Sequence, residues 1–148
     1  MLAHVLQREG ADVVIADAAL PGRSSQAAAG IINPVTGKRF VKSWRLDEFF
    51  PVAQRNYQEM ESMLGISIWE KRPILRLLGS PEEINDWSSR CAHADYAQHL
   101  GERSDAGDWT PFLKPGFHFG IIRQAARVNF PKLLASFRDQ ILAADRLI

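Results

Sequence analysis

The sequence has 148 residues, and its 18 basic and 17 acidic side chains leave a net charge of +1, which excludes a strong electrostatic attraction to nucleic acid or membrane surfaces. The length suits a globular protein with a core of ordinary size, and no apolar run approaches the length of a membrane span. The single cysteine, Cys91, excludes an internal disulfide, and no charged-then-apolar signal pattern opens the sequence, so we expect a cytoplasmic protein.

Residues 1–17 have the pattern of a helix, a tight turn and a buried strand. Apolar side chains share one face of residues 1–9, and Gly10 stands where a helix ends. The apolar run at 13–16 has no polar alternation, which predicts a strand buried on both faces of a parallel sheet. Asp17 then either simply ends the strand or, as in a βαβ dinucleotide unit, accepts hydrogen bonds from a ribose. The glycine-rich G-x-G-x-x-G loop of such a unit does not occur in the sequence.

Residues 24–30 are nearly all small, and the residues that follow Gly30, up to residue 34, are mostly apolar. Glycine allows the backbone to approach a bulky group closely, and serine hydroxyls with free N–H groups near a helix start suit a phosphate. The alternative is an ordinary alanine-rich helix start that is capped by Ser24 or Ser25.

Asp17 together with residues 22–34 resembles the N-terminal region of the FAD-dependent D-amino-acid oxidase superfamily, and is most similar to its glycine oxidase and sarcosine oxidase branch. The resemblance implies that Asp17 holds the adenosine ribose of FAD, with Ala18 on the adenine side. It also implies that Ser24 and Ser25 face the phosphates. The remaining cofactor-binding residues implied by it line the ribityl chain and the flavin edge: Ala28, Ala29, Gly30 and Ile31.

A basic segment follows, with Lys38, Arg39, Lys42 and Arg45. The simpler interpretation is a solvated loop, because basic clusters on loops are common. The functional interpretation is that one of these residues, with Lys38 and Arg39 as the weak candidates, attracts a substrate carboxylate.

The rest of the chain alternates between helices and strands. Residues 47–64 form the clearest predicted helix, with Asp47 as its N-cap and Gly65 at its end. Its predicted buried stripe is Phe49, Phe50, Ala53, Tyr57, Met60 and Leu64. Strands are expected at 66–69, 73–79, 117–122 and 125–128, and helices after the capping box at Ser80 and after Asn129. Residues 126–131 resemble the return from substrate domain to FAD domain in the same superfamily.

Cys91, His93 and His99 offer three possible metal ligands, but they lack the closely spaced pairs of a structural zinc site, so no metal is expected. The four histidines are equally unassigned as catalysts, since each is better explained as a surface or core side chain.

The fold class expected from these patterns and from the resemblance is α/β. It comprises an incomplete Rossmann-like FAD-binding domain and part of a mixed-sheet (α+β) substrate domain. Residues 1–65 and 129–148 are assigned to the partial FAD-binding domain, and residues 66–128 to the partial substrate domain. Because the family's glycine loop and most of its substrate domain have no counterpart here, we expect a fragment that is inactive alone.

The resemblance implies one function: part of an FAD-dependent oxidoreductase that oxidises an amine or amino acid by hydride transfer to flavin. Its expected partner is a small amine or amino-acid substrate, with no membrane and no nucleic acid. One alternative is a non-catalytic α/β interaction domain or an inactive fragment. Another is a flavin-dependent tRNA-modifying relative, which would place the basic residues of 38–45 on phosphates.

Overall fold

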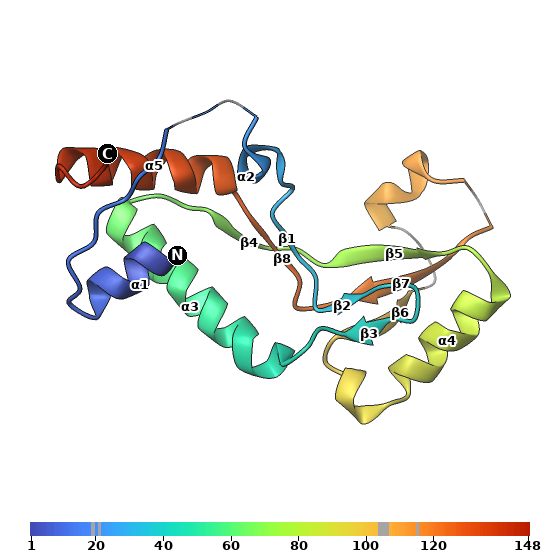
Figure 1. Cartoon of the computed structure of the whole chain (residues 1–148). Helices are drawn as coiled ribbons and strands as arrows, with labels where there is room; N and C mark the ends of the chain where they lie inside the picture. Colours follow the sequence, from blue (N-terminus) through green and yellow to red (C-terminus); the bar gives the residue numbers. More distant parts are fainter. Residues whose placement is uncertain (19, 21, 104–106, 115) are drawn as a thin grey trace. The chain divides into compact units, whose positions relative to one another are not determined.

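The computed structural model describes residues 1–18, 20, 22–103, 107–114 and 116–148, and divides into two compact units (Figure 1). Unit 1 contains Met1–Gly30, Glu48–Trp69 and Arg127–Ile148, and unit 2 contains Ile31–Asp47 and Glu70–Ala126. No helix in the part of the chain that the structure describes is long and apolar enough to cross a membrane.

The division into units differs from the expected domain division mainly in residues 31–47, and by a few residues at 66–69 and 127–128, which belong to unit 1. Residues 31–47 belong to unit 2, although the sequence places them with the FAD-binding domain. The side chains of Val35 and Phe40 explain this grouping, because they are buried in the apolar cluster of unit 2. The assignment of one unit to FAD and the other to substrate stays a prediction.

Unit 1 is mainly helical. Its helices are α1 (Leu2–Arg8), α2 (Ser24–Ala27), residues 48–64 of α3 (Leu46–Leu64) and α5 (Phe130–Ala143). Figure 1 shows α2 beside α5, and α1 beside α3. The Arg8 guanidinium joins α1 to α3 through Glu59, at 2.7 Å. The buried apolar side chains of this unit are Met60, Ile68, Val128, Leu133 and Ile141.

The predicted stripe on α3 is confirmed only in part. Met60 is fully buried, and Tyr57 packs between the rings of Trp69 and Phe130, with centroid separations of 5.5 and 6.4 Å. Phe49, by contrast, is exposed. The stripe therefore contacts its neighbours from Phe50 onward, since the Phe50 ring meets Trp69 edge to face at 5.8 Å.

Both ends of α3 have a clear physical cause. The helix begins at Leu46, so Asp47 lies inside it and the predicted N-cap is wrong. The Asp47 carboxylate instead pairs with side chains of unit 2. At the other end Gly65 takes a positive φ of 63°, which glycine adopts without steric cost and which ends the helix as predicted. The Glu61 carboxylate then accepts hydrogen bonds from the Ile68 and Trp69 N–H groups, at 2.6 and 2.8 Å.

The strand expected at 13–16 is reduced to a single parallel bridge between Ile15 and Leu147. Backbone hydrogen bonds join Ile15 and Asp17 to residues 146–148. Val14 is 59% exposed, so the expectation of burial on both faces is wrong. Among the described residues, this short bridge is the only strand pairing that the structure shows for the segment.

Unit 2 contains an antiparallel sheet in the order β5–β7–β6, formed by β5 (Ile74–Leu78), β7 (His118–Ile122) and β6 (Leu100–Arg103). Leu75 and Gly101 both pair with Ile121, which fixes the register on the two sides of β7. A short hairpin of β2 (Val35–Thr36) and β3 (Val41–Lys42) and the helix α4 (Pro81–Cys91) complete the unit with two 3-10 turns, Ala94–Tyr96 and Gly107–Phe112.

The remaining short strands lie where the chain passes from one unit to the other: β1 (Ile31–Ile32), β4 (Trp69–Lys71) and β8 (Ala126–Val128). Strands were therefore correctly expected at 73–79, 117–122 and 125–128, whereas the strand expected at 66–69 begins only at Trp69.

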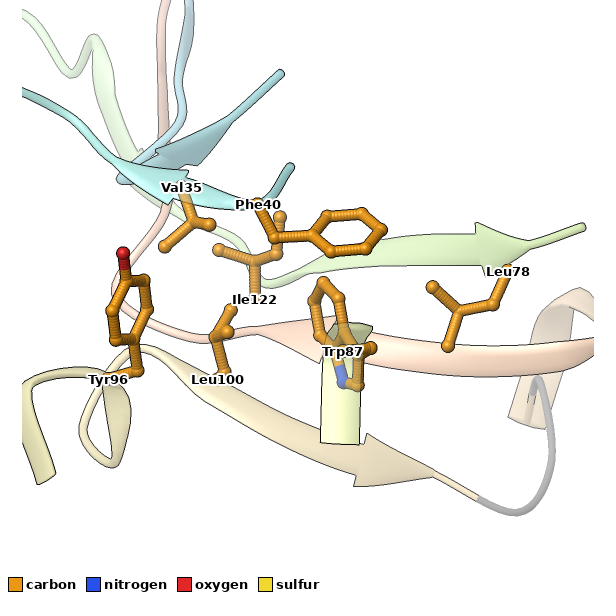
Figure 2. Packing of buried hydrophobic residues seen from close by; sticks show 7 residues of the cluster. All are labelled: Val35, Phe40, Leu78, Trp87, Tyr96, Leu100 and Ile122. Atoms are coloured by element: carbon orange, nitrogen blue, oxygen red, sulfur yellow. The ribbon is translucent and has the colours of Figure 1, made fainter. Parts of the chain in front are cut away.

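The core of unit 2 surrounds Trp87, which is 1% exposed (Figure 2). Its ring meets Phe40 edge to face at 5.0 Å, and its indole N–H donates to the Gly101 carbonyl at 3.2 Å. Gly120 is required beneath it, because an added Cβ would lie 2.1 Å from the indole. The cluster drawn in Figure 2 is Val35, Phe40, Leu78, Trp87, Tyr96, Leu100 and Ile122.

The helix caps predicted at Ser80 and Asn129 are confirmed, unlike the one at Asp47. The Ser80 hydroxyl accepts from the Glu83 N–H at 3.2 Å, and Glu83 in turn accepts from the Gly79 N–H at 2.8 Å. The Asn129 side chain accepts from the Lys132 N–H at 3.1 Å and begins α5. These local signals fix where α4 and α5 start.

Candidate functional site

Asp17, the predicted ribose acceptor, lies at the end of the short pairing with residues 146–148, and its side chain is 32% exposed. Two arginines bind its carboxylate. Arg23 Nη1 donates to Oδ2 at 3.1 Å, and Arg138 Nη1, from α5, donates to the same oxygen. The carboxylate is therefore held by side chains from two segments while about a third of its side-chain surface stays exposed.

The small-residue segment lies open to solvent. Residues 24–29 are all exposed, as is Ile31. Ser24 is the first residue of α2, and Arg23 occupies the N-cap position without a side-chain capping bond. The alternative interpretation, a helix capped by Ser24 or Ser25, is therefore wrong. The four-residue α2 leaves the backbone of Ala28 and Ala29 extended and uncovered.

Gly30 ends this segment and is buried. Its φ is +71°, and an added Cβ would lie 1.9 Å from the Val128 carbonyl oxygen. The Val128 N–H donates to the Gly30 carbonyl at 2.8 Å. Only glycine permits this close backbone approach, which anchors the exposed segment to the residues that lead into α5.

Lys38 and Arg39, the predicted substrate residues, lie on the exposed turn between β2 and β3. They line a pocket of about 580 Å³ whose other wall is one face of α4: Glu82, Glu83, Asp86, Ser89 and Arg90. The α4 wall therefore places three carboxylate side chains opposite the basic side chains of Lys38 and Arg39. The pocket therefore presents both signs of charge rather than a purely cationic surface for a carboxylate.

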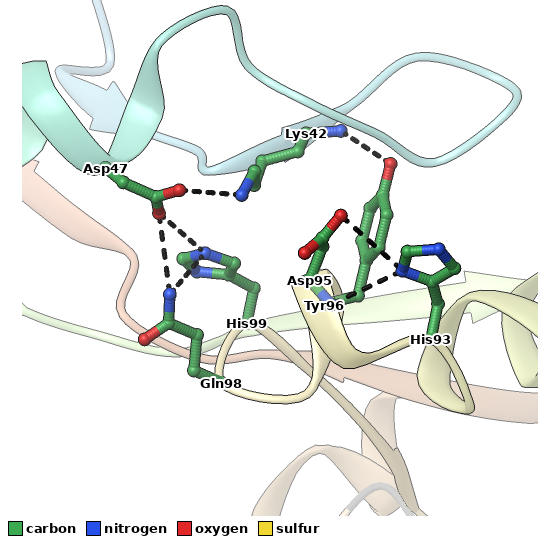
Figure 3. Close-up of polar contacts among 7 residues, drawn as sticks. All are labelled: Lys42, Asp47, His93, Asp95, Tyr96, Gln98 and His99. Carbon is green, nitrogen blue, oxygen red and sulfur yellow. Dashed lines mark hydrogen bonds and ion pairs between the residues drawn. The ribbon is translucent and has the colours of Figure 1, made fainter.

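A polar network joins β3, α3 and the turn before β6 (Figure 3). The Asp47 carboxylate binds the Lys42 ammonium at 2.7 Å, and lies 3.4 Å from Nε2 of His99, which is 2% exposed. The Tyr96 hydroxyl accepts from the Lys42 N–H at 3.3 Å. Burial lowers the pKa of His99 from 6.5, and the neighbouring Asp47 opposes that effect. The hydrogen bond to Lys42 lowers the pKa of Asp47.

This network changes the interpretation of the basic segment. Lys42 is held by Asp47, and the Arg45 guanidinium lies over the Trp44 ring at 5.3 Å. Two of the four basic residues that a tRNA-binding surface would use are therefore engaged within the protein.

The three possible metal ligands do not converge. His99 is buried beside Asp47, His93 lies 3.7 Å from Asp95, and burial raises the pKa of the Cys91 thiol. Within the described part of the chain, no three His, Cys, Asp or Glu side chains form a group that could hold a metal ion.

Sequence reasoning did not assign a role to Arg23 or Arg138. Arg23 lies among the residues that carry the resemblance, directly before the small-residue segment, but the resemblance gave it no role. Arg138 follows Leu134 by four residues and precedes Ile141 by three, which places it on the apolar face of α5. A charged residue in that position needs a partner, and this is the signal that could have pointed to an acidic contact.

The comparisons with known proteins concern the family and the fold. The chain matches the family model described as "FAD dependent oxidoreductase" over residues 1–145. Its fold is similar to the crystal structure of an iminodiacetate oxidase from Chelativorans sp. BNC1, with a TM-score of 0.62 and 22% sequence identity. The match covers 98% of this chain and 42% of the other, so the chain spans less than half the length of that oxidase.

Proposed function

Because the chain belongs to the family of FAD dependent oxidoreductases, whose model matches residues 1–145, we propose that it is part of an oxidoreductase that oxidises an amine or amino acid. FAD is the cofactor of this family. The substrate class comes from the resemblance of residues 17–34 to glycine and sarcosine oxidases, and the structural neighbour acts on iminodiacetate, which is also an amine and an acid.

The observation that carries the proposal is an accessible carboxylate close to an open segment of small residues. The Asp17 side chain is 32% exposed, and residues 24–29 are all exposed. These features fit FAD, because a carboxylate would accept from its ribose hydroxyls and a segment of mostly small residues would leave room for the rest of the cofactor. The bound flavin would supply the redox chemistry, as the acceptor of a hydride from the carbon next to the substrate nitrogen.

The roles of the individual residues follow the resemblance. Asp17 holds the adenosine ribose, and Ala18 lies on the adenine side. Ser24 and Ser25 face the phosphates. The residues along the ribityl chain and the flavin edge are Ala28, Ala29, Gly30 and Ile31. Lys38 and Arg39 attract the substrate carboxylate, with the acidic wall of the same pocket available for its ammonium group.

The first experiment is the visible absorption spectrum of the chain after expression with added FAD and desalting. We expect a retained flavin band in the wild type and its loss in Asp17→Asn, with Asp12→Asn as the matched control because Asp12 pairs with Arg146 away from this segment. A colourless wild-type protein that melts cooperatively would instead favour a non-catalytic domain. Bleaching of the retained flavin band by glycine, sarcosine or iminodiacetate without oxygen would support the substrate class and would overturn the expectation that the chain is inactive alone.

A further inference from the structure

The Asp17 carboxylate has two cationic partners of different origin. Arg138 belongs to α5, a 14-residue helix that is capped by Asn129 and packed through Leu133 and Ile141. Arg23 lies in the loop between Gly22, with a φ of +79°, and the four-residue α2. One partner is therefore fixed by a packed helix, whereas the other is attached to a short exposed segment.

The charges around Asp17 do not balance. One carboxylate faces two guanidinium groups, so the cluster carries a net positive charge. The hydrogen-bonding of Arg23 is also incomplete, because its Nε is buried and has no acceptor among the described residues. A guanidinium with a donor left over binds a phosphate well, since its planar set of N–H groups matches two phosphate oxygens.

We propose that these arginines have different tasks, in an inference that rests on the proposed function. Arg138 is a positioning residue that holds the Asp17 carboxylate in the orientation needed to accept from the adenosine ribose. Arg23 is a further cofactor-binding residue, which leaves Asp17 for the diphosphate of FAD when the cofactor binds. Arg23 directly precedes Ser24, which is assigned to the phosphates. It therefore belongs to the chain segment from which a side chain would exchange the Asp17 carboxylate for the diphosphate.

Three ligands distinguish the two tasks experimentally: FAD, ADP and adenosine. Their dissociation constants are measured by titration calorimetry on the full chain. Arg23→Gln is expected to weaken FAD and ADP about tenfold and to leave adenosine unchanged, because only the first two carry a diphosphate. Arg138→Gln is expected to weaken all three by a similar factor, because each carries the ribose. Arg23→Lys restores part of the affinity for ADP, since the charge remains.

Arg146→Gln is the matched control. Arg146 is in the same unit and pairs with an exposed carboxylate, Asp12, at 2.9 Å. Its loss is expected to change none of the three dissociation constants. Added salt should weaken ADP binding less in Arg23→Gln than in the wild type, because one screened charge pair has been removed.

Several results would overturn the inference while leaving the proposed function intact. They are an equal loss of ADP and adenosine affinity in Arg23→Gln, or unchanged adenosine affinity in Arg138→Gln. If the wild type binds none of the three ligands, the proposed cofactor site is wrong, and the task of Arg23 fails with it.

The positioning task of Arg138 has a readout that needs no ligand. A double-mutant cycle of Asp17→Asn and Arg138→Gln in urea unfolding should show coupling of about tenfold in the unfolding equilibrium constant. The exposed pair Asp12→Asn and Arg146→Gln should show at most about threefold. Equal coupling in the two cycles would contradict the assignment. If Arg138→Gln does not fold, Arg138→Lys replaces it in both experiments.

Discussion

Unit 2 fills its apolar interior with its own side chains, whereas the part of unit 1 that carries the proposed cofactor residues leaves backbone and small side chains in solvent. Trp87 is enclosed by aromatic and aliphatic neighbours, and the carbonyl of Gly101 satisfies its N–H. Residues 24–29 have no such cover. The comparison teaches that the side chains that pack the interior and the residues proposed to bind the cofactor belong to different parts of this molecule.

Two carboxylates show the same contrast on a smaller scale. Asp47 lies beside the buried His99 and ties the start of α3 to the turn before β6. Asp17 lies beside two partly exposed arginines and next to the open segment. The first contact pairs an exposed carboxylate with a buried histidine inside unit 2, and the second pairs a carboxylate with two guanidinium groups beside the proposed cofactor segment.

Replacing Trp87 with alanine tests the packed side of this comparison and should have the largest effect. We expect the free energy of unfolding to fall by about 3–5 kcal/mol, because a large ring and its hydrogen bond are lost from a closed interior. Urea unfolding followed by circular dichroism measures the change. Trp109→Ala is the control, since Trp109 is 61% exposed and its loss should change the free energy by less than about 0.5 kcal/mol. Similar losses in the two variants would contradict the comparison.

Gly30→Ala tests the anchor of the open segment. The positive φ costs about 1–2 kcal/mol for alanine, and the clash with the Val128 carbonyl adds about 1–3 kcal/mol. Gly37→Ala separates the two terms, because Gly37 has a φ of +74° and nothing within 4 Å of an added Cβ. The same urea unfolding measures both variants. If Gly30→Ala and Gly37→Ala lower the free energy of unfolding equally, the close approach of Gly30 to Val128 does not contribute to stability.

His99 should make the stability of unit 2 depend on pH. Since burial lowers its pKa in the folded state, the unfolded chain binds a proton first as the pH falls. Neutral His99 therefore contributes its full share of the free energy of unfolding above pH 6.5, the pKa of the unfolded chain. That share is lost as the pH falls from 6.5 to the lower pKa of His99 in the folded protein. The slope should reach at most about 1.4 kcal/mol per pH unit. His99→Gln should flatten this part of the profile, and the exposed His118→Gln should leave it unchanged.

The smallest expected effects come from the two helix caps, one in each unit. Ser80→Ala and Asn129→Ala should each cost about 1 kcal/mol, because a backbone N–H of the first turn loses its acceptor. Native-state hydrogen exchange should localise the first loss to α4 and the second to α5. A change in both helices from either variant would show that the two units open together, and Ser62→Ala, on the exposed face of α3, is the control.

Much of the fold was predictable because its signals are local. Ser80 with Pro81 and Glu83, and Asn129 with Pro131, specify helix starts through contacts within one turn. Gly65 specifies a helix end in the same way. The predicted α/β class and the family agree with the comparisons, since the motif of residues 17–34 is contiguous in sequence.

The roles of individual polar side chains were less predictable, because their partners are far away in sequence. Asp47 has the sequence context of a helix cap, but Lys42 and the distant His99 give it another task. The 13–16 run is apolar enough for a central strand, yet its neighbours in space, not its composition, decide how much of it is buried.

The sequence by itself determined where α4 and α5 begin, where α3 ends, and which segment resembles an FAD-binding motif. Only the tertiary structure decided that Asp17 has Arg138 as a partner, 121 residues away, and that His99 is buried. The physical reason is one of range. Capping and backbone strain act within a turn of chain, whereas charge pairing and burial depend on which distant segments the fold brings together.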